Sequence, residues 1–337
     1  MISKLQQTVL SPATVREKPS AVPCQSFAPM RVRGFRCSVP AQNPYISLAG
    51  SSTHTPISLS ANRISRLTRT KAQGTLFDYL HCTRGFHFID AEYISKNSPL
   101  FLQHLLSKVD NEQNISRALT RFFRYNPINE FEPFFESLGL TPSEYASLLP
   151  RNLMFLGDDD VMLDNFHVLC DYGIPRSKIG RMYKEAKEIF GYECGILATR
   201  FGAYEDLGLS KPAVIRLVCC CPSLLVGSVN NEFVRILEIL KGLGFDKDWI
   251  GGYLSDKISY NWKRMLDTMG FLTEVGYSET QLGILFKTNP VLLFEGSGQR
   301  IYILVGRLLK LGLRMNEVYA IFLNIPQILS PKCTKNL

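Results

Sequence analysis

Apolar and polar residues alternate along most of the chain with the spacing of amphipathic helices, and the apolar stretches end at glycines. Phe233, Ile236, Leu237 and Leu240 share one face of a predicted helix that stops before Gly244. Glycine at such a position adopts the left-handed conformation that commonly ends helices. Equivalent glycines recur at steps of 34, 35, 36, 32 and 36 residues, namely Gly139, Gly173, Gly208, Gly244, Gly276 and Gly312. A period near 35 residues is typical of a helical repeat array.

The better-defined copies of the repeat predict three helices in each unit. Ser210 and Ser278 stand two residues after their glycines and are suitable N-caps, so a second helix begins almost at once. It ends at a proline fourteen residues after the glycine, as at Pro222 and Pro290, where Pro-x-Leu-Leu predicts a short helix. A longer third helix, at 231–241 or 299–310, closes the unit. Such a unit cannot bury a core alone, so neighbouring units must stack and share one.

The repeated Leu-Gly-Leu-Ser, followed fourteen residues later by Pro-x-Leu-Leu, resembles the repeat of the mitochondrial transcription termination factor (mTERF) family. The resemblance covers about residues 126–331, and the segment 121–140 looks like the start of the array in plant members. The units at Gly173 and Gly244 depart from the pattern, because Lys187 and Ile258 stand at the position of the proline. The sequence stops at Leu337, inside its sixth unit. The likeness is strongest at three of the glycines, namely Gly208, Gly276 and Gly312.

These features predict an all-α fold, a right-handed-type α-solenoid of roughly 35-residue, three-helix mTERF-like repeats that is truncated in its last repeat. We divide the chain into a disordered transit peptide at 1–74, an N-terminal helical extension at 75–125, the repeat array at 126–331 and a tail at 332–337. The chain has no run of eighteen uncharged apolar residues, so we expect no membrane span.

The first 74 residues differ in composition from the rest of the chain. Glu17 is their only acidic residue, against ten basic ones, and serine and threonine are frequent. Without a continuous apolar region, this composition indicates an organellar transit peptide, and its hydroxyl content favours the chloroplast over the mitochondrion. A disordered basic tail that binds a partner is the alternative. The whole chain has 38 basic and 30 acidic residues, so subtracting ten and one leaves 28 and 29. The high pI therefore does not by itself support nucleic-acid binding.

No residue pattern indicates catalysis, a cofactor or a bound metal. The acidic segment 158–160 predicts the first turn of a helix and not a calcium loop, and the five histidines are scattered. We expect the cysteines at 219–221 to be buried structural thiols, and the segment 296–298 to be a turn. These observations argue against an enzyme.

Aligning the units on their glycines places basic residues at equivalent positions, which point the same way in a solenoid and could track phosphates. Trp262 could stack on a base if it is exposed. The arginines of segment 117–124 fall on one side of a helix, and we interpret them as a solvated face. The candidate nucleic-acid-binding residues are Arg176, Lys178, Arg181, Lys184, Arg200, Lys211, Arg216, Arg235, Lys263, Arg264, Lys287, Arg300 and Arg307.

The resemblance implies a monomeric organellar protein that binds DNA or RNA and acts in chloroplast gene expression, in transcription, its termination or RNA processing. Other gene-expression proteins of the organelle are further candidate partners. The competing hypothesis is a scaffold that binds a protein of the expression machinery without touching nucleic acid. The near-neutral charge beyond residue 74 favours the scaffold.

Overall fold

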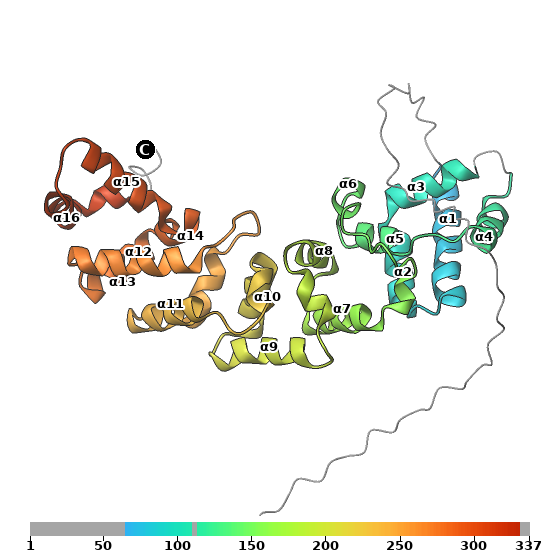
Figure 1. Ribbon diagram of the computed structural model, residues 1–337, viewed down its shortest axis with the longest axis horizontal. Coiled ribbons are helices and arrows are strands. Elements are labelled where there is room, and N and C mark those ends of the chain that lie inside the picture. Colours follow the sequence, from blue (N-terminus) through green and yellow to red (C-terminus); the bar gives the residue numbers. More distant parts are fainter. Residues whose placement is uncertain (1–64, 110–112, 331–337) are drawn as a thin grey trace, which may run out of the picture. The chain divides into compact units, whose positions relative to one another are not determined.

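The computed structural model describes residues 65–109 and 113–330, which belong to one compact unit of the chain. Within these ranges the structure contains sixteen α-helices, short 3-10 segments, one π-helix and no strands (Figure 1). The all-α repeat fold predicted from the sequence is therefore confirmed. No helix in these ranges has the length and apolar character that crossing a membrane requires. The predicted tail at 332–337 lies outside the described residues.

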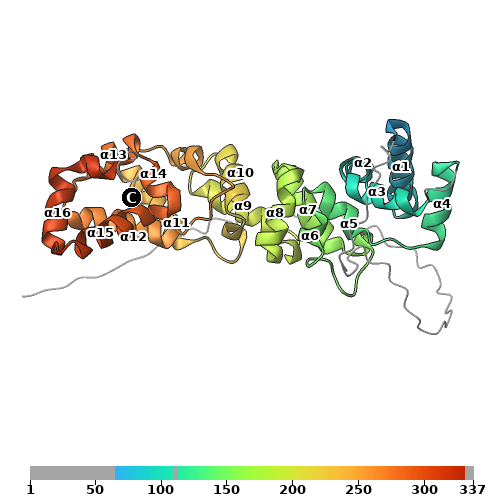
Figure 2. The same cartoon turned by 90° about the horizontal axis from the view of Figure 1, so that it is seen from above.

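The N-terminal extension begins earlier than the sequence predicts. Ser65 caps the first helix by accepting a hydrogen bond from Thr68 N at 3.0 Å, and Ala72 and Leu76 are buried, so residues 66–74 fold with the extension. The remaining part of the predicted transit peptide, 1–64, lies outside the described residues. Helix α1 packs on α2 and α4 (Figure 2). The elements are α1 (Arg66–Asp78), the π-helix η1 (Tyr79–Thr83), α2 (Phe88–Asn97), α3 (Pro99–Lys108) and α4 (Ile115–Tyr125).

The array repeats one order of elements, in which a helix ends at a repeating glycine and a second helix and a short helical segment follow. The helices that end at the glycines are α5 (Phe131–Ser137), α7 (Asp160–Tyr172), α9 (Ile196–Asp206), α11 (Asn231–Gly242), α12 (Trp262–Val275) and α15 (Gln299–Lys310). The helices that follow them are α6 (Pro142–Tyr145), α8 (Arg176–Glu185), α10 (Lys211–Cys220), α13 (Glu279–Thr288) and α16 (Met315–Asn324). The short segments are η2 (Leu156–Asp158), η3 (Lys187–Gly191), η4 (Pro222–Leu225), η5 (Lys247–Tyr253), α14 (Val291–Phe294), η6 (Glu295–Gly298) and η7 (Pro326–Leu329).

The predicted helix ends are confirmed. All six repeating glycines have positive φ, from 82° at Gly244 to 110° at Gly276, which side chains other than glycine rarely adopt. Ser210 and Ser278 cap α10 and α13, and Ser278 forms the predicted capping box with Gln281. These local signals set the short turn between consecutive helices.

The unit that begins at Gly244 is the exception to the three-helix pattern. A 3-10 segment, η5, replaces its second helix, and residues 254–261 form an irregular loop before α12. Gly251 and Gly252 lie in this segment, and glycine disfavours a regular helix. The loop leaves backbone carbonyl groups that no helix satisfies, and these become acceptors for side chains of the preceding units.

Neighbouring units share their core through aromatic side chains. The buried ring of Phe233 on α11 contacts Tyr204 on α9 at a centroid distance of 6.0 Å and Trp262 on α12 at 5.0 Å. Tyr204 also donates its hydroxyl to the carbonyl of Leu224 at 2.7 Å, so η4 is tied to the same core. Three successive units are thus joined by one row of rings, as a stacked array requires.

Candidate nucleic-acid interface

Three of the predicted residues converge on the irregular loop at 254–256. Lys178 and Arg181 lie on α8, and Arg216 lies on α10 at the position equivalent to Arg181. Arg181 donates to the backbone carbonyls of Asp256 and Cys220, and Lys178 pairs with the Asp256 carboxylate. Arg216 Nη2 donates to the carbonyl of Leu254 at 3.2 Å. We call Lys178, Arg181 and Arg216 the central basic cluster.

The central basic cluster keeps an excess of positive charge. Its carboxylate neighbours are Asp256 and Glu185, and the latter accepts from Arg181 Nε at 2.6 Å. Hydrogen bonding and charge attraction from Lys178 lower the pKa of Asp256, so its carboxylate is ionised at neutral pH. Two carboxylates thus face three cations. Arg216 is exposed and the Lys178 side chain is 41% exposed, so the cluster is accessible to an anion from solvent.

The cysteines beside the cluster are packing residues, as the sequence predicts. Cys220 and Cys221 are buried and Cys219 is half-buried. Burial raises the pKa of all three thiols, to about 11 for Cys219, which keeps them protonated at neutral pH. Because the thiolate is the nucleophile and metal ligand, these side chains are poorly suited to either role.

The basic residues three positions after the glycines reach back to the preceding unit, and Arg176 also reaches the N-terminal extension. Arg176 Nη2 lies 2.6 Å from Oδ1 of Asp90, and its guanidinium lies 5.2 Å from the ring centroid of Phe166. Lys211 Nζ lies 4.9 Å from the ring centroid of Tyr172. Lys247 donates to the carbonyl of Leu207 at the end of α9. These contacts link neighbouring parts of the chain. They also engage, within the protein, cations that were predicted to bind phosphates.

Apart from Arg200, the other predicted residues fall into two groups. The partnered group comprises Lys184, whose Nζ lies 2.9 Å from Oε1 of Glu144, and Arg300, which pairs with Glu295. The Arg200 side chain is partly buried, and its Nε has no hydrogen-bond partner among the described residues. The second group is exposed and makes no ion pair within the described part of the chain: Arg235, Lys263, Arg264, Lys287 and Arg307.

Trp262 cannot stack on a base, because its side chain is only 7% exposed. Its ring packs against Tyr260 and Phe233 at centroid distances of 5.5 Å and 5.0 Å. The exposed aromatic residue near the same cations is Tyr302, which lines a shallow depression with Lys263 and Arg264. Tyr302 comes from α15 in the next unit, so sequence spacing could not connect it with α12.

A second cluster that the sequence did not reveal lies where α2 meets α7. His87, Asp90 and His167 offer metal-ligand atoms within 4.8 Å of one another. His167 Nε2 lies 2.8 Å from Oδ2 of Asp90, and Arg176 takes the other carboxylate oxygen. Both oxygens of Asp90 are therefore engaged by protein groups, and we interpret the cluster as an ion-pair network between the extension and the array. His167 lies 77 residues after Asp90 in the sequence, so their spacing gives no sign that they meet.

Comparison with known proteins gives one informative relative. The chain is 28% identical over 305 aligned residues to the Arabidopsis thaliana protein "Transcription termination factor MTEF18, mitochondrial". The alignment covers 79% of this chain and 54% of that protein, so the chain spans about half the length of the curated relative it matches. No family model matches the chain, and neither does any solved structure.

Proposed function

Since the chain belongs to the mitochondrial transcription termination factor family, we propose that it binds organellar DNA or RNA through its repeats. It acts in chloroplast gene expression, in transcription, its termination or RNA processing. The observation that carries this proposal is the convergence of Lys178, Arg181 and Arg216 on one loop from two successive units. Cations at repeating positions are what a chain of phosphates requires. The protein works as a monomer and without catalysis.

The central basic cluster holds phosphates, and the exposed cations of the later units extend this contact along the array. Among the described residues, Arg235, Lys263, Arg264, Lys287 and Arg307 pair with no carboxylate, so they are available to phosphates or bases. Lys184 would exchange Glu144 for a phosphate. The cations that pack between or within units support the surface by positioning it: Arg176, Arg200, Lys211 and Arg300.

The test is immunoprecipitation of the tagged full chain from isolated organelles, followed by sequencing of the co-purified DNA and RNA after salt washes. We expect discrete peaks that disappear in the double variant Lys178→Gln, Arg216→Gln. The matched control is Lys241→Gln, an exposed cation on α11 outside the aligned positions. Because Arg216 also contacts the 254–256 loop, thermal unfolding of the variant must first show a folded protein. Absence of peaks from the unaltered chain would refute nucleic-acid binding.

The compartment needs its own experiment. The serine-rich and threonine-rich first segment favours the chloroplast, whereas the name of the Arabidopsis relative places that protein in the mitochondrion. Residues 1–74 fused to a fluorescent protein will report import in plant cells. Chlorophyll-coincident fluorescence supports the chloroplast, and coincidence with a mitochondrial dye would move the proposed function to that organelle.

A protein scaffold is the second candidate function, and an apolar groove in the last two units favours it. The groove has a volume of about 380 Å³ between α13 and α16, and Ile284 and Leu323 on its walls are 64% and 39% exposed. Exposed apolar surface of this kind is typical of protein-binding sites. Recovery of partner proteins without nucleic acid in the immunoprecipitation would favour this function.

A further inference from the structure

We propose that α1 and α4, which lie outside the repeat array, form a second surface that binds an unpaired stretch of DNA or RNA. We call it the α1–α4 basic surface and define it by Lys71, Arg117, Arg121, Arg124 and Tyr125. The arginines and the lysine hold phosphates, and Tyr125 stacks on a base. This inference rests on the proposed nucleic-acid binding but concerns a different site from the central basic cluster.

The charge of these helices is strongly one-sided. Among α1, η1 and α4 the acidic side chains amount to Asp78 alone, against six cations. The earlier start of α1 matters here, because it moves Arg66, Arg69 and Lys71 from the predicted transit peptide into the folded protein. Residues 65–337 then carry 31 basic and 29 acidic residues, since three are added to the 28 counted beyond residue 74. This part of the sequence therefore has a local basic patch despite its small net charge.

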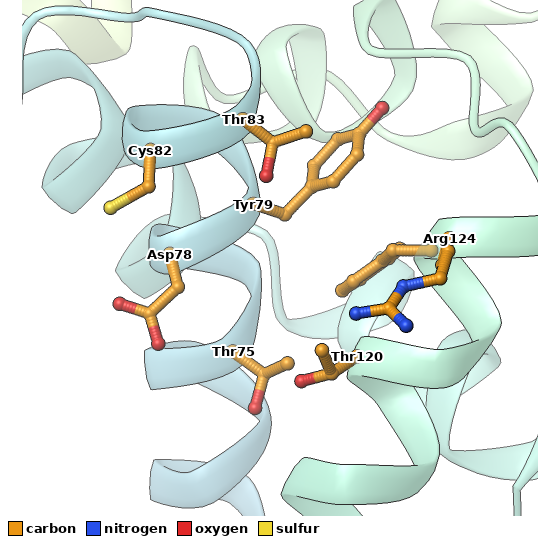
Figure 3. A pocket seen from close by; sticks show the side chains of 8 residues that line it. Thr75, Asp78, Tyr79, Cys82, Thr83, Thr120 and Arg124 are labelled. Atoms are coloured by element: carbon orange, nitrogen blue, oxygen red, sulfur yellow. The ribbon is translucent and has the colours of Figure 1, made fainter.

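One of these cations, Arg124, lines an open cavity between the two helices. The cavity has a volume of about 270 Å³ and is lined by Thr75 and Asp78 on one side and by Thr120 and Arg124 on the other. Figure 3 shows the guanidinium of Arg124 extending from α4 into the space that faces α1, while Asp78 lies on the α1 side. Arg124 forms no ion pair within the described residues, so its donors are available to a phosphate oxygen.

Further cations lie beside Arg124 on α4 and on the facing helix α1. Arg117, Arg121 and Arg124 are spaced by four and three residues and therefore share one side of α4, whose opposite side buries Leu119 and Phe123. On α1, Lys71 precedes the cavity-lining Thr75 by one helical turn. A single strand of DNA or RNA that enters the cavity would thus contact cations from two helices that pack against each other.

Tyr125 distinguishes this surface from an ordinary solvated helix face. It is 72% exposed at the C-terminal end of α4, directly after Arg124. Its ring makes no aromatic contact among the described residues. An exposed aromatic ring beside a row of cations is the combination with which proteins bind single strands, because cations track the phosphates and the ring stacks on a base.

The experiment measures fluorescence anisotropy of a fluorescein-labelled, mixed-sequence single-stranded DNA with the full chain over a series of KCl concentrations. We expect the double variant Arg117→Gln, Arg124→Gln to bind more weakly and to lower the slope of log K against log salt by about 0.7 for each phosphate that the variant no longer neutralises. Tyr125→Ala should weaken binding about 5- to 100-fold with the slope retained, and Tyr125→Phe should restore it. Asp78→Asn should tighten binding.

The controls separate this proposal from the proposed function. Lys241→Gln should bind as the unaltered chain does. If Lys178→Gln, Arg216→Gln weakens binding while the α4 and Tyr125 variants do not, the second surface is refuted and the array still binds nucleic acid. If the unaltered chain binds only the duplex form of this DNA, the second surface is refuted and the proposed function stands. If it binds neither single strand, nor the duplex, nor an RNA of the same sequence, both proposals fail. The side chains altered on α1 and α4 are exposed, so matched circular dichroism spectra and melting temperatures will exclude unfolding as the cause.

Discussion

Arg176 on α8 and Asp90 on α2 form a 2.6 Å contact between Nη2 and Oδ1 that joins the repeat array to the N-terminal extension. The side chains are 19% and 6% exposed, and the guanidinium also lies 4.8 Å from the ring centroid of Tyr93. Burial disfavours the charged form of Asp90, but hydrogen bonds from His167 and Arg176 outweigh it and hold the carboxyl pKa below its usual value. The pair is therefore ionised at neutral pH and depends on both partners.

Arg176→Ala should destabilise the protein by about 3 kcal/mol, because it leaves a largely buried carboxylate without its cation. Lys184→Ala is the matched control, since Lys184 and Glu144 are 49% and 38% exposed and such a pair contributes about 0–1 kcal/mol. Urea unfolding followed by circular dichroism measures both. Equal destabilisation in the two variants would show that the Arg176 contact is not a structural link.

His167 makes the same junction sensitive to pH. Its hydrogen bond to Asp90 raises the pKa of His167 above the ordinary 6.5, against the opposing effects of burial and of Arg176. A group whose pKa is higher in the folded than in the unfolded protein stabilises the fold at pH values below its unfolded pKa. That stabilisation is lost as the pH rises through its folded pKa. Asp90 behaves in the opposite sense, because its pKa is lower in the folded protein. Its ionised carboxylate stabilises the fold at pH values above the unfolded pKa near 3.8, and this stabilisation is lost as the pH falls.

The His167–Asp90 pair should therefore stabilise the protein most between about pH 4 and 6.5. The melting temperature of the unaltered chain minus that of His167→Gln should be largest in this window and should shrink above it. His87, Asp171 and Arg176 surround His167 and are retained in both proteins. A difference that stays constant from pH 5 to 9 would contradict a charged His167.

Gly180 on α8 marks a close approach to the backbone of the preceding unit. A Cβ atom there would lie 2.6 Å from the carbonyl oxygen of Leu138 and 2.9 Å from Cγ of Leu140. Gly180→Ala should cost about 1–3 kcal/mol, because α8 must move away from the end of α5. Gly202→Ala, inside α9 with nothing within 4 Å of the added carbon, should instead stabilise by about 0.5–1 kcal/mol. Opposite signs in urea unfolding are the expected result, and a stabilising Gly180→Ala would contradict this packing.

Sequence reasoning succeeded where the signal is local. The left-handed glycines, the Ser278 capping box and helix α15 at 299–310 depend on residues a few positions apart, and each is confirmed. The candidate interface depends on contacts over long separations, such as the 86 residues between Asp90 and Arg176. Equivalent positions in a repeat predict that their side chains point the same way. They do not predict which cation contacts a carboxylate, an aromatic ring or a backbone carbonyl. The exposure of Trp262 was left open in the sequence for the same reason, and the structure shows it buried.

Replacement of Asp256 tests the central basic cluster in the opposite direction to the cation replacements, because it should tighten nucleic-acid binding where they weaken it. Its carboxylate pairs with Lys178 beside Arg181, and its lowered pKa keeps it ionised, so it repels an approaching phosphate. Asp256→Asn should tighten binding of single-stranded DNA several-fold at low salt, with the gain fading as salt screens the charges. Glu238→Gln, an exposed acid on α11, is the control for a change in net charge alone. If Asp256→Asn tightens binding no more than Glu238→Gln does, the cluster does not face the nucleic acid, and the exposed cations of the later units become the stronger candidates.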